Sequence, residues 1–225
     1  MLMENKPRLG KELWTHSSPR EKFAALFHVA ISKHAPMTLK IIAEGGGKDV
    51  RRKVNQALRR EHGPYVHGSM YIDNSLVNGI FTVLGIVDRQ PNDRYSYLIT
   101  PEGQVAVKAA EIATAYLKYQ PSTDLPLRTS TSKVREGELF SRSFLQADLL
   151  LHLGIKHNLS GSELMRFLGE LNPHVPIDFV RSLENITLNG LAFEKQGIYE
   201  LTQKGQELFT ELLQPLASLA GYEPI

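Results

Sequence analysis

Residues 97–104 read Tyr-Leu-Ile-Thr-Pro-Glu-Gly-Gln, and residues 199–206 read Tyr-Glu-Leu-Thr-Gln-Lys-Gly-Gln. Two further landmarks recur upstream of each phrase: an Ile-Asp pair at 72–73 and 177–178, and a glycine at 85 and 190. The upstream landmarks are offset by 105 positions and the two phrases by 102. The first copy therefore has three more residues than the second between its glycine landmark and its phrase. The tip of a β-hairpin would accommodate such a difference. Two copies of one small domain are the simplest explanation.

The composition is that of a globular chain. Its 225 residues are enough for two domains that each hold a core, and 42% of them are hydrophobic, which is too many for a disordered chain. No apolar run approaches the ~20 residues of a membrane span, and the polar N-terminus lacks the apolar core of a signal peptide. The absence of cysteine excludes disulfides and thiolate metal sites, and it makes the cytoplasm the expected compartment.

Hydrophobic spacing and the positions of proline and glycine predict a similar order of elements in both copies. In the first copy we expect helices over 19–35, 38–43, 48–61, 72–84 and 101–118, and strands over 86–90 and 95–100. In the second copy we expect helices over 144–156, 160–171, 176–189 and 203–219, and strands over 191–195 and 198–202. The expected fold class is therefore mainly α with small β-hairpins. The domains expected are 1–119, which contains an inserted basic helix, and 143–225, joined by a flexible linker over 120–142.

The repeated phrase resembles the third strand and following turn of winged helix-turn-helix transcription regulators, where it often reads Tyr-x-Leu-Thr-x-x-Gly. In such a phrase the threonine caps the next helix, and the glycine lets that helix pack closely. The order of three helices, a hairpin and a long helix is similar to the same family. The resemblance implies two tandem winged helix-turn-helix domains related by the internal repeat. It also implies DNA binding by the third helix and by the hairpin, or wing.

The net charge of +2 conceals a difference between the halves of the chain. Residues 1–120 carry 17 lysines and arginines against 11 acidic residues, a net charge of +6. Residues 121–225 carry 9 against 13, a net charge of −4. The first half therefore suits a polyanion such as double-stranded DNA, whereas the acidic second half suits a protein partner.

The basic helix over 48–61 is the strongest candidate for DNA contact. Its cations are Lys48, Arg51, Arg52, Lys53, Arg59 and Arg60, and Asn55 and Gln56 add amide groups. Apolar residues at 50, 54 and 58 would hold one side of the helix, so that the cations project from the others. Such a face can neutralise several phosphates. The alternative is an ordinary solvated helix surface.

The helix expected over 72–84 and the tip of the hairpin, or wing, are weaker candidates. Leaving aside the inserted basic helix, 72–84 is the third helix of the first copy, and we call it so below. Asn74 and Asn78 could read base edges, and Arg89 and Arg94 flank the hairpin tip, where they could contact phosphates or a minor groove. Val77 and Phe81 are apolar on the face expected to be exposed, so they either pack beneath the basic helix or form a protein contact. In the second copy the third helix has a net charge of −1, which favours packing or partner binding.

Catalysis finds little support in the sequence. Asp148 and His152 have the i, i+4 spacing of a metal site, but His152 recurs as His28 at the equivalent place in a core helix, which favours a structural histidine. No phosphate-binding loop, dinucleotide motif, nucleophile elbow or zinc-protease pattern is present. We therefore expect no enzyme activity, no cofactor and no metal.

The function expected is that of a cytoplasmic transcription regulator that binds specific double-stranded DNA as a homodimer. The dimer contact is expected on one of the long helices that end the copies, with preference for the C-terminal one. That helix carries more apolar residues than one core face needs: Leu208, Phe209, Leu212, Leu213, Leu216 and Leu219. The alternative is a compact monomer in which these residues pack against the first copy. The main alternative is a protein-interaction adaptor, since the layout also resembles tandem winged-helix subunits of chromosome-condensing and sorting complexes. The acidic second half and the apolar Val77 and Phe81 favour that alternative. A plasmid or phage replication initiator is a third possibility.

Overall fold

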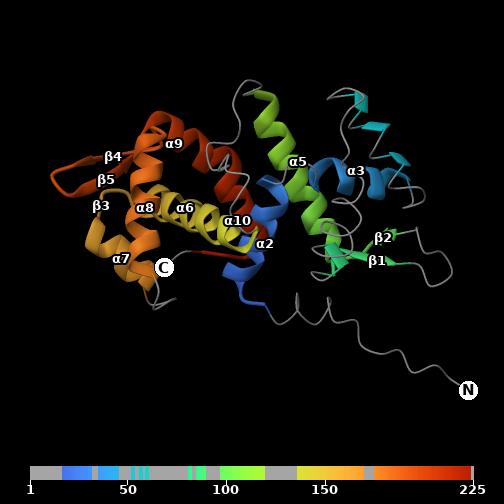
Figure 1. Ribbon diagram of the computed structural model, residues 1–225, viewed down its shortest axis with the longest axis horizontal. Helices are drawn as coiled ribbons and strands as arrows, with labels where there is room; N and C mark the ends of the chain where they lie inside the picture. The colour runs from blue at the N-terminus through green and yellow to red at the C-terminus, as the bar shows by residue number, and fades with distance from the viewer. Residues whose placement is uncertain are drawn as a thin grey trace, which may run out of the picture. The chain divides into compact units, whose positions relative to one another are not determined.

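The computed structural model describes residues 17–31, 35–45, 52–53, 56–57, 59–60, 81–82, 85–89, 97–119, 136–169 and 175–223. Helices predominate among them and two small antiparallel sheets complete the fold, which confirms the expected mainly α class with hairpins (Figure 1). The chain divides into two compact units, Met1–Thr114 and Ala115–Ile225. In the part of the chain that the structure describes, no helix has both the length and the apolar character needed to cross a membrane.

The first unit is built on two N-terminal helices, a hairpin and a long helix. These are α2 (Pro19–Ile31), α3 (Ala35–Gly45), β1 (Val87–Arg89), β2 (Tyr97–Ile99) and α5 (Gly103–Tyr119), the last of which continues past the unit boundary. The strands pair antiparallel with Val87 opposite Ile99. Its core is aromatic and aliphatic, since Phe23, Leu26 and Phe27 of α2 are fully buried, as are Leu39 and Ile42 of α3.

The expected helix over 19–35 is wrong at its C-terminal end. The structure ends α2 at Ile31 and begins α3 at Ala35, so that Pro36 is the second residue of α3 and does not terminate the helix before it. Proline suits this place because the N–H groups of a helix's first turn have no partner within the helix. The helix expected over 38–43 is therefore extended toward its N-terminus.

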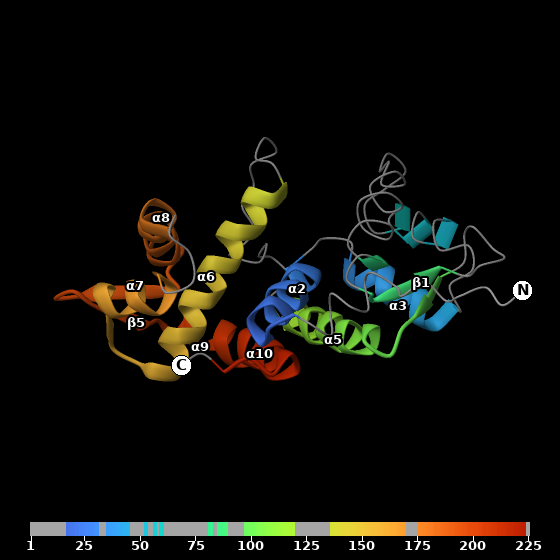
Figure 2. The same ribbon diagram turned by 90° about the horizontal axis from the view of Figure 1, so that it is seen from below.

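The second unit contains more described elements. These are α6 (Glu136–Lys156), β3 (Leu159–Ser160), α7 (Gly161–Gly169), α8 (Val175–Leu188), β4 (Ala192–Lys195), β5 (Ile198–Leu201), α9 (Gln203–Leu208), the π-helical turn η2 (Phe209–Leu213) and α10 (Gln214–Ala220). The strands form an antiparallel sheet in the order β3-β5-β4. Helix α6 packs against α8 and η2 (Figure 1, Figure 2). Because α6 begins at Glu136, residues 136–142 are helical, which corrects the expected flexible linker over that stretch.

The end of the third helix and the start of the hairpin have the same geometry in both units. Gly85 and Gly190 both have a φ of +66°, a left-handed conformation that glycine adopts without strain. The N–H of Ile86 donates to the carbonyl of Phe81 at 2.8 Å, and the N–H of Leu191 donates to the carbonyl of Ile186 at 2.9 Å. Each glycine therefore ends a helix and turns the chain into the first strand of the hairpin.

The threonine of the repeated phrase caps the following helix in both units. Thr100 Oγ1 accepts from the Gly103 N–H at 2.9 Å and donates to the Gly85 carbonyl. Thr202 Oγ1 accepts from the Gly205 N–H at 3.1 Å and donates to the carbonyl of Gly190 at 2.6 Å. The hydroxyl thus joins the start of the last helix to the end of the third helix, which confirms the predicted capping role.

The phrase's glycine allows a backbone contact that no other residue would permit. A Cβ atom on Gly103 would lie 2.0 Å from the carbonyl oxygen of Ile86, and one on Gly205 would lie 1.9 Å from that of Leu191. The predicted close packing is therefore confirmed in both units. The register also matches, since Val87 opposes Ile99 in one hairpin and Ala192 opposes Leu201 in the other. The three extra residues of the first copy consequently lie between β1 and β2.

Serine-to-glutamate capping boxes begin two helices. Glu21 accepts from the N–H and the hydroxyl of Ser18 at the start of α2, and Glu163 does the same with Ser160 at the start of α7. The Ser18 N–H, and then its hydroxyl, hold the pKa of Glu21 below its usual 4.5. The Ser160 hydroxyl, and then its N–H, lower the pKa of Glu163 in the same way. The cap-like start expected at Ser17-Ser18-Pro19 is therefore a capping box.

The C-terminal helix is interrupted by a π-helical turn. η2 ends at Leu213, and Pro215 follows within the first turn of α10. Proline has no N–H to donate to the preceding turn, and a wider π turn is one way for a helix to continue around that gap. The apolar residues of this segment are not free: Leu208, Phe209, Leu212, Leu213 and Leu216 are buried. The exposed stripe expected as a dimer contact is therefore wrong.

Candidate nucleic-acid interface

Six residues of the expected basic helix are described, and all of them are helical: Arg52, Lys53, Gln56, Ala57, Arg59 and Arg60. Arg52, Gln56, Arg59 and Arg60 are exposed, whereas Lys53 and Ala57 are half-buried. The exposed residues have the spacing i, i+4, i+7 and i+8, which is that of one face of an α-helix. We call these four residues the arginine face. Three guanidinium groups and an amide on one exposed face provide many hydrogen-bond donors and three positive charges.

The described charges of the first unit fall into two groups, those of the basic helix and those outside it. Outside the basic helix, the described residues of the unit include five basic and five acidic side chains. The basic ones are Arg20, Lys22, Lys40, Arg89 and Lys108, and the acidic ones are Glu21, Glu44, Asp88, Glu102 and Glu111. One of these pairs, Lys40 with Glu44, is an exposed i, i+4 ion pair at 3.9 Å. The excess charge of the described first unit therefore lies on the basic helix.

Several predicted site residues lie outside the described residues: Lys48, Arg51, Asn55, Asn74, Asn78 and Arg94, together with Val77. Arg89 is the last residue of β1, opposite Tyr97, so it lies in the strand that leads to the hairpin tip. The structure therefore describes the arginine face and the base of the hairpin. Base reading by Asn74 or Asn78 stays a prediction.

Phe81 is fully buried, so of the two alternatives expected for it the structure favours packing within the protein over a contact with a partner. It lies in a π-helical turn at the end of that helix, just before the Gly85 turn. The burial removes Phe81 as a reason for expecting a protein partner in the first unit.

Helix α8 of the second unit corresponds to the helix expected over 72–84, and its exposed surface combines charged and apolar side chains. Arg181 and Glu184 are exposed, and so are Val180 at 50% and Leu188 at 84%. Ser182, a possible DNA contact by its residue type, is buried. The β4–β5 turn consists of Gln196 and Gly197, with φ values of 55° and 80°, which is the two-residue turn of a tight hairpin. In its described residues, this unit therefore offers neither a cationic helix face nor a long hairpin turn.

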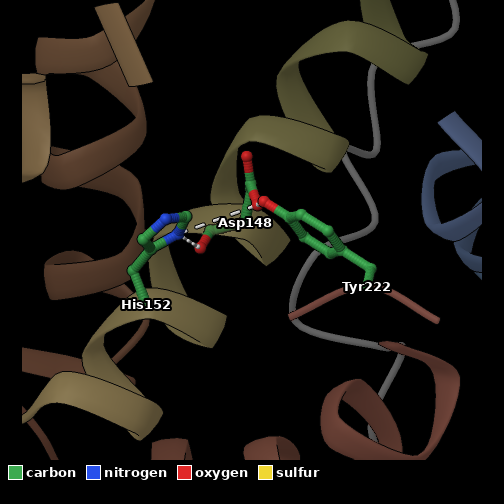
Figure 3. Close-up of polar contacts among 3 residues, drawn as sticks. All are labelled: Asp148, His152 and Tyr222. Atoms are coloured by element: carbon green, nitrogen blue, oxygen red, sulfur yellow. Dashed lines mark hydrogen bonds and ion pairs between the residues drawn. The ribbon is translucent and has the colours of Figure 1, made fainter. Parts of the chain in front are cut away.

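The possible metal pair of α6 is part of a structural hydrogen-bond group (Figure 3). His152 Nδ1 donates to the carbonyl oxygen of Asp148 at 2.8 Å, and the Tyr222 hydroxyl donates to Asp148 Oδ1 at 2.9 Å. The His152 ring is buried and stacks on Phe167 with centroids 5.5 Å apart. Within the described residues, no group of three or more possible ligands could hold a metal ion. These contacts agree with the structural role predicted for His152.

Tyr222 is a member of this group that sequence reasoning missed. It follows the left-handed cap at Gly221, and its N–H donates to the carbonyl of Ala217 at 2.9 Å. The cap turns the chain back so that Tyr222 reaches Asp148, 74 positions away. No local pattern in the sequence links residues at that separation.

In comparisons with known proteins, no family model matches this chain, and no curated protein or solved structure matches it either.

Proposed function

We propose that this protein is a transcription regulator that binds double-stranded DNA through its first unit. The observation that carries the proposal is the arginine face, where Arg52, Arg59 and Arg60 are exposed at helical spacing. The other described charges of that unit balance, so its excess described positive charge lies on the basic helix. Arginine pairs with phosphate oxygens through two parallel hydrogen bonds, and release of the DNA's counterions favours such contacts.

The repeated junction supports two winged-helix units as the scaffold. In both units a helix ends at a left-handed glycine, a hairpin follows, and a threonine caps the next helix against a glycine. In the second unit the order is helix, short strand, helix, helix, hairpin, helix, with a three-stranded sheet. That order is similar to a winged helix, in which the third helix and the wing contact DNA.

A second candidate function is a protein-interaction adaptor, and the surface of α8 favours it. Val180 and Leu188 are exposed there, and the described residues of this helix do not carry a net positive charge. Leu188 is exposed at 84%, and Val180 lies on the same side of the helix, so two apolar side chains are available to a partner there. The two functions are compatible, because the arginine face and α8 belong to different units.

The experiment is DNA binding by the full chain, measured as fluorescence anisotropy of a labelled duplex. We expect Arg59→Ala with Arg60→Ala to weaken binding at least tenfold, because two phosphate contacts are lost. The matched control is Lys156→Ala with Lys195→Ala, which removes the same charge from exposed positions of the second unit. Equal weakening by both double variants would show a general charge effect, and the absence of binding by the intact chain would reject the proposal.

A further inference from the structure

The outer face of α8 is an exposed surface with two kinds of side chain. Phe179, Leu183 and Ile186 point into the core and are buried. Val180, Arg181, Glu184 and Leu188 lie on the opposite side of the helix and are exposed. We call these four residues the α8 outer face. Eight residues correspond to ~12 Å of helix, so apolar side chains lie near both ends and two charges lie between them.

The exposed charges that the structure describes on α8 and on the neighbouring elements α7, β4 and β5 are balanced. The exposed charged residues of α7, α8, β4 and β5 that the structure describes comprise three acidic and three basic ones. They are Glu163, Glu184 and Glu194, and Arg166, Arg181 and Lys195. A neutral surface with mixed charges and exposed apolar groups fits a partner that is also neutral and mixed. The α8 outer face itself has these properties.

Arg181 and Glu184 make the face complementary to itself. Two copies of a helix can pack antiparallel about a two-fold axis. If residue i of one copy then contacts residue j of the other, residue j of the first copy also contacts residue i of the second. Residues 181 and 184 are separated by ~4.5 Å along the helix, less than one turn. An axis between them places Arg181 opposite the second copy's Glu184, and Glu184 opposite the second copy's Arg181. The same arrangement carries Leu188 toward the N-terminal part of the second helix, where Val180 lies.

We propose that the α8 outer face binds the same face of a second copy of this chain, in an antiparallel homodimer. Two symmetric Arg181–Glu184 ion pairs lie at its centre, and Leu188 is covered at each end. The proposal goes beyond DNA binding and does not depend on it, because the arginine face is in the other unit. It replaces the C-terminal helix as the expected contact, since the apolar side chains of that helix are buried within the chain.

The test is the mass of the full chain in solution, measured by sedimentation and by light scattering from 1 to 50 µM. Arg181→Glu and Glu184→Arg each place like charges opposite each other, so each variant should weaken the dimer at least tenfold. A mixture of the two variants restores opposite charges at every pair and should form a heterodimer with the affinity of the intact chain. Lys156→Glu and Glu211→Arg change the charge equally at exposed positions away from α8 and should leave the dimer intact.

Each outcome decides the proposal. A monomeric mass for the intact chain at 50 µM overturns it, and so does a mixture of the two variants that stays monomeric. Dimerisation of Arg181→Glu with the affinity of the Lys156→Glu control would show that another surface is used. Because Arg181 and Glu184 are exposed, circular dichroism should show unchanged folding in all variants. The DNA affinity of the Arg181→Glu and Glu184→Arg variants is measured separately, so that a failure of dimerisation can be distinguished from a failure of DNA binding.

Discussion

Gly205 lies so close to Leu191 that a Cβ atom on the glycine would come within 1.9 Å of the leucine's carbonyl oxygen. Gly103 has the same relationship to Ile86, at 2.0 Å. In both cases the obstacle is backbone, which cannot rotate away as a flexible side chain can. The start of the last helix and the start of the hairpin are therefore held together by a contact that excludes any side chain.

Replacing Gly205 by alanine should destabilise the protein by at least about 2 kcal/mol, because the new methyl group forces the two backbone segments apart. Gly103→Ala should do the same. The control is Gly161→Ala at the start of α7, where a Cβ would lie 3.6 Å from the Tyr199 ring, an ordinary contact distance. Urea denaturation followed by circular dichroism measures all three. A Gly205→Ala variant as stable as Gly161→Ala would contradict the close packing.

Thr202→Val should cost about 1 kcal/mol of stability, the usual effect of losing a helix N-cap. Valine has nearly the shape of threonine, but it cannot accept from the Gly205 N–H or donate to the carbonyl of Gly190. Thr202→Ser keeps the hydroxyl and should stay near the stability of the intact chain. If the valine and serine variants unfold at the same urea concentration, the cap contributes nothing measurable.

The capping boxes should contribute stability that depends on pH. The pKa of Glu21 and that of Glu163 are lowered in the folded protein from their usual 4.5. A carboxyl with a lowered folded-state pKa stabilises the protein fully above its unfolded pKa, and this contribution is lost as pH falls through the folded value. Glu21→Gln with Glu163→Gln should therefore be less stable than the intact chain above about pH 5, with a difference that shrinks between pH 4.5 and pH 3.

Urea denaturation at pH 7, 5, 4 and 3 measures that difference. Glu111→Gln, in the middle of α5, is the control for removing an exposed carboxylate that begins no helix. A stability difference that stays constant down to pH 3 would rule out the carboxylates as the source of the capping contribution.

Tyr222→Phe should destabilise the protein by about 1–3 kcal/mol, because Asp148 is fully buried and loses a hydrogen-bond donor. Tyr199→Phe is the control, since Tyr199 is half-buried and no hydrogen bond of its hydroxyl to a described residue is found. Thermal unfolding at neutral pH compares the two. A Tyr222→Phe variant with the melting temperature of Tyr199→Phe would mean that the hydroxyl adds no stability.

The junction between hairpin and helix could be predicted from the sequence because all of its determinants are local. The cap at Thr202, the contact at Gly205 and the turn at Gly190 depend on residue types with few alternatives: a hydroxyl, a missing Cβ and a left-handed backbone. The order of helices followed from apolar spacing. The boundaries were less accurate, because Pro36 suits both the end of one helix and the first turn of the next.

Features that depend on tertiary contacts or on irregular backbone could not be predicted. The strand β3 has two residues, which is too short for any alternation to be visible. Phe81 and most apolar residues of the C-terminal helix are buried by packing within the chain, which spacing along a single helix does not show. For the candidate site, the sequence identified the cations, and the structure added that Arg52, Gln56, Arg59 and Arg60 are exposed.

The salt dependence of DNA binding tests the role of the arginine face most directly. The full chain and the Arg59→Ala, Arg60→Ala variant are titrated with one labelled duplex at several salt concentrations between 50 and 300 mM. Each phosphate contact contributes ~0.9 to the slope of log affinity against log salt concentration. The account predicts that the variant's slope is shallower by about 1–2 and that the Lys156→Ala, Lys195→Ala control keeps the slope of the intact chain. An unchanged slope in the arginine variant would contradict the account.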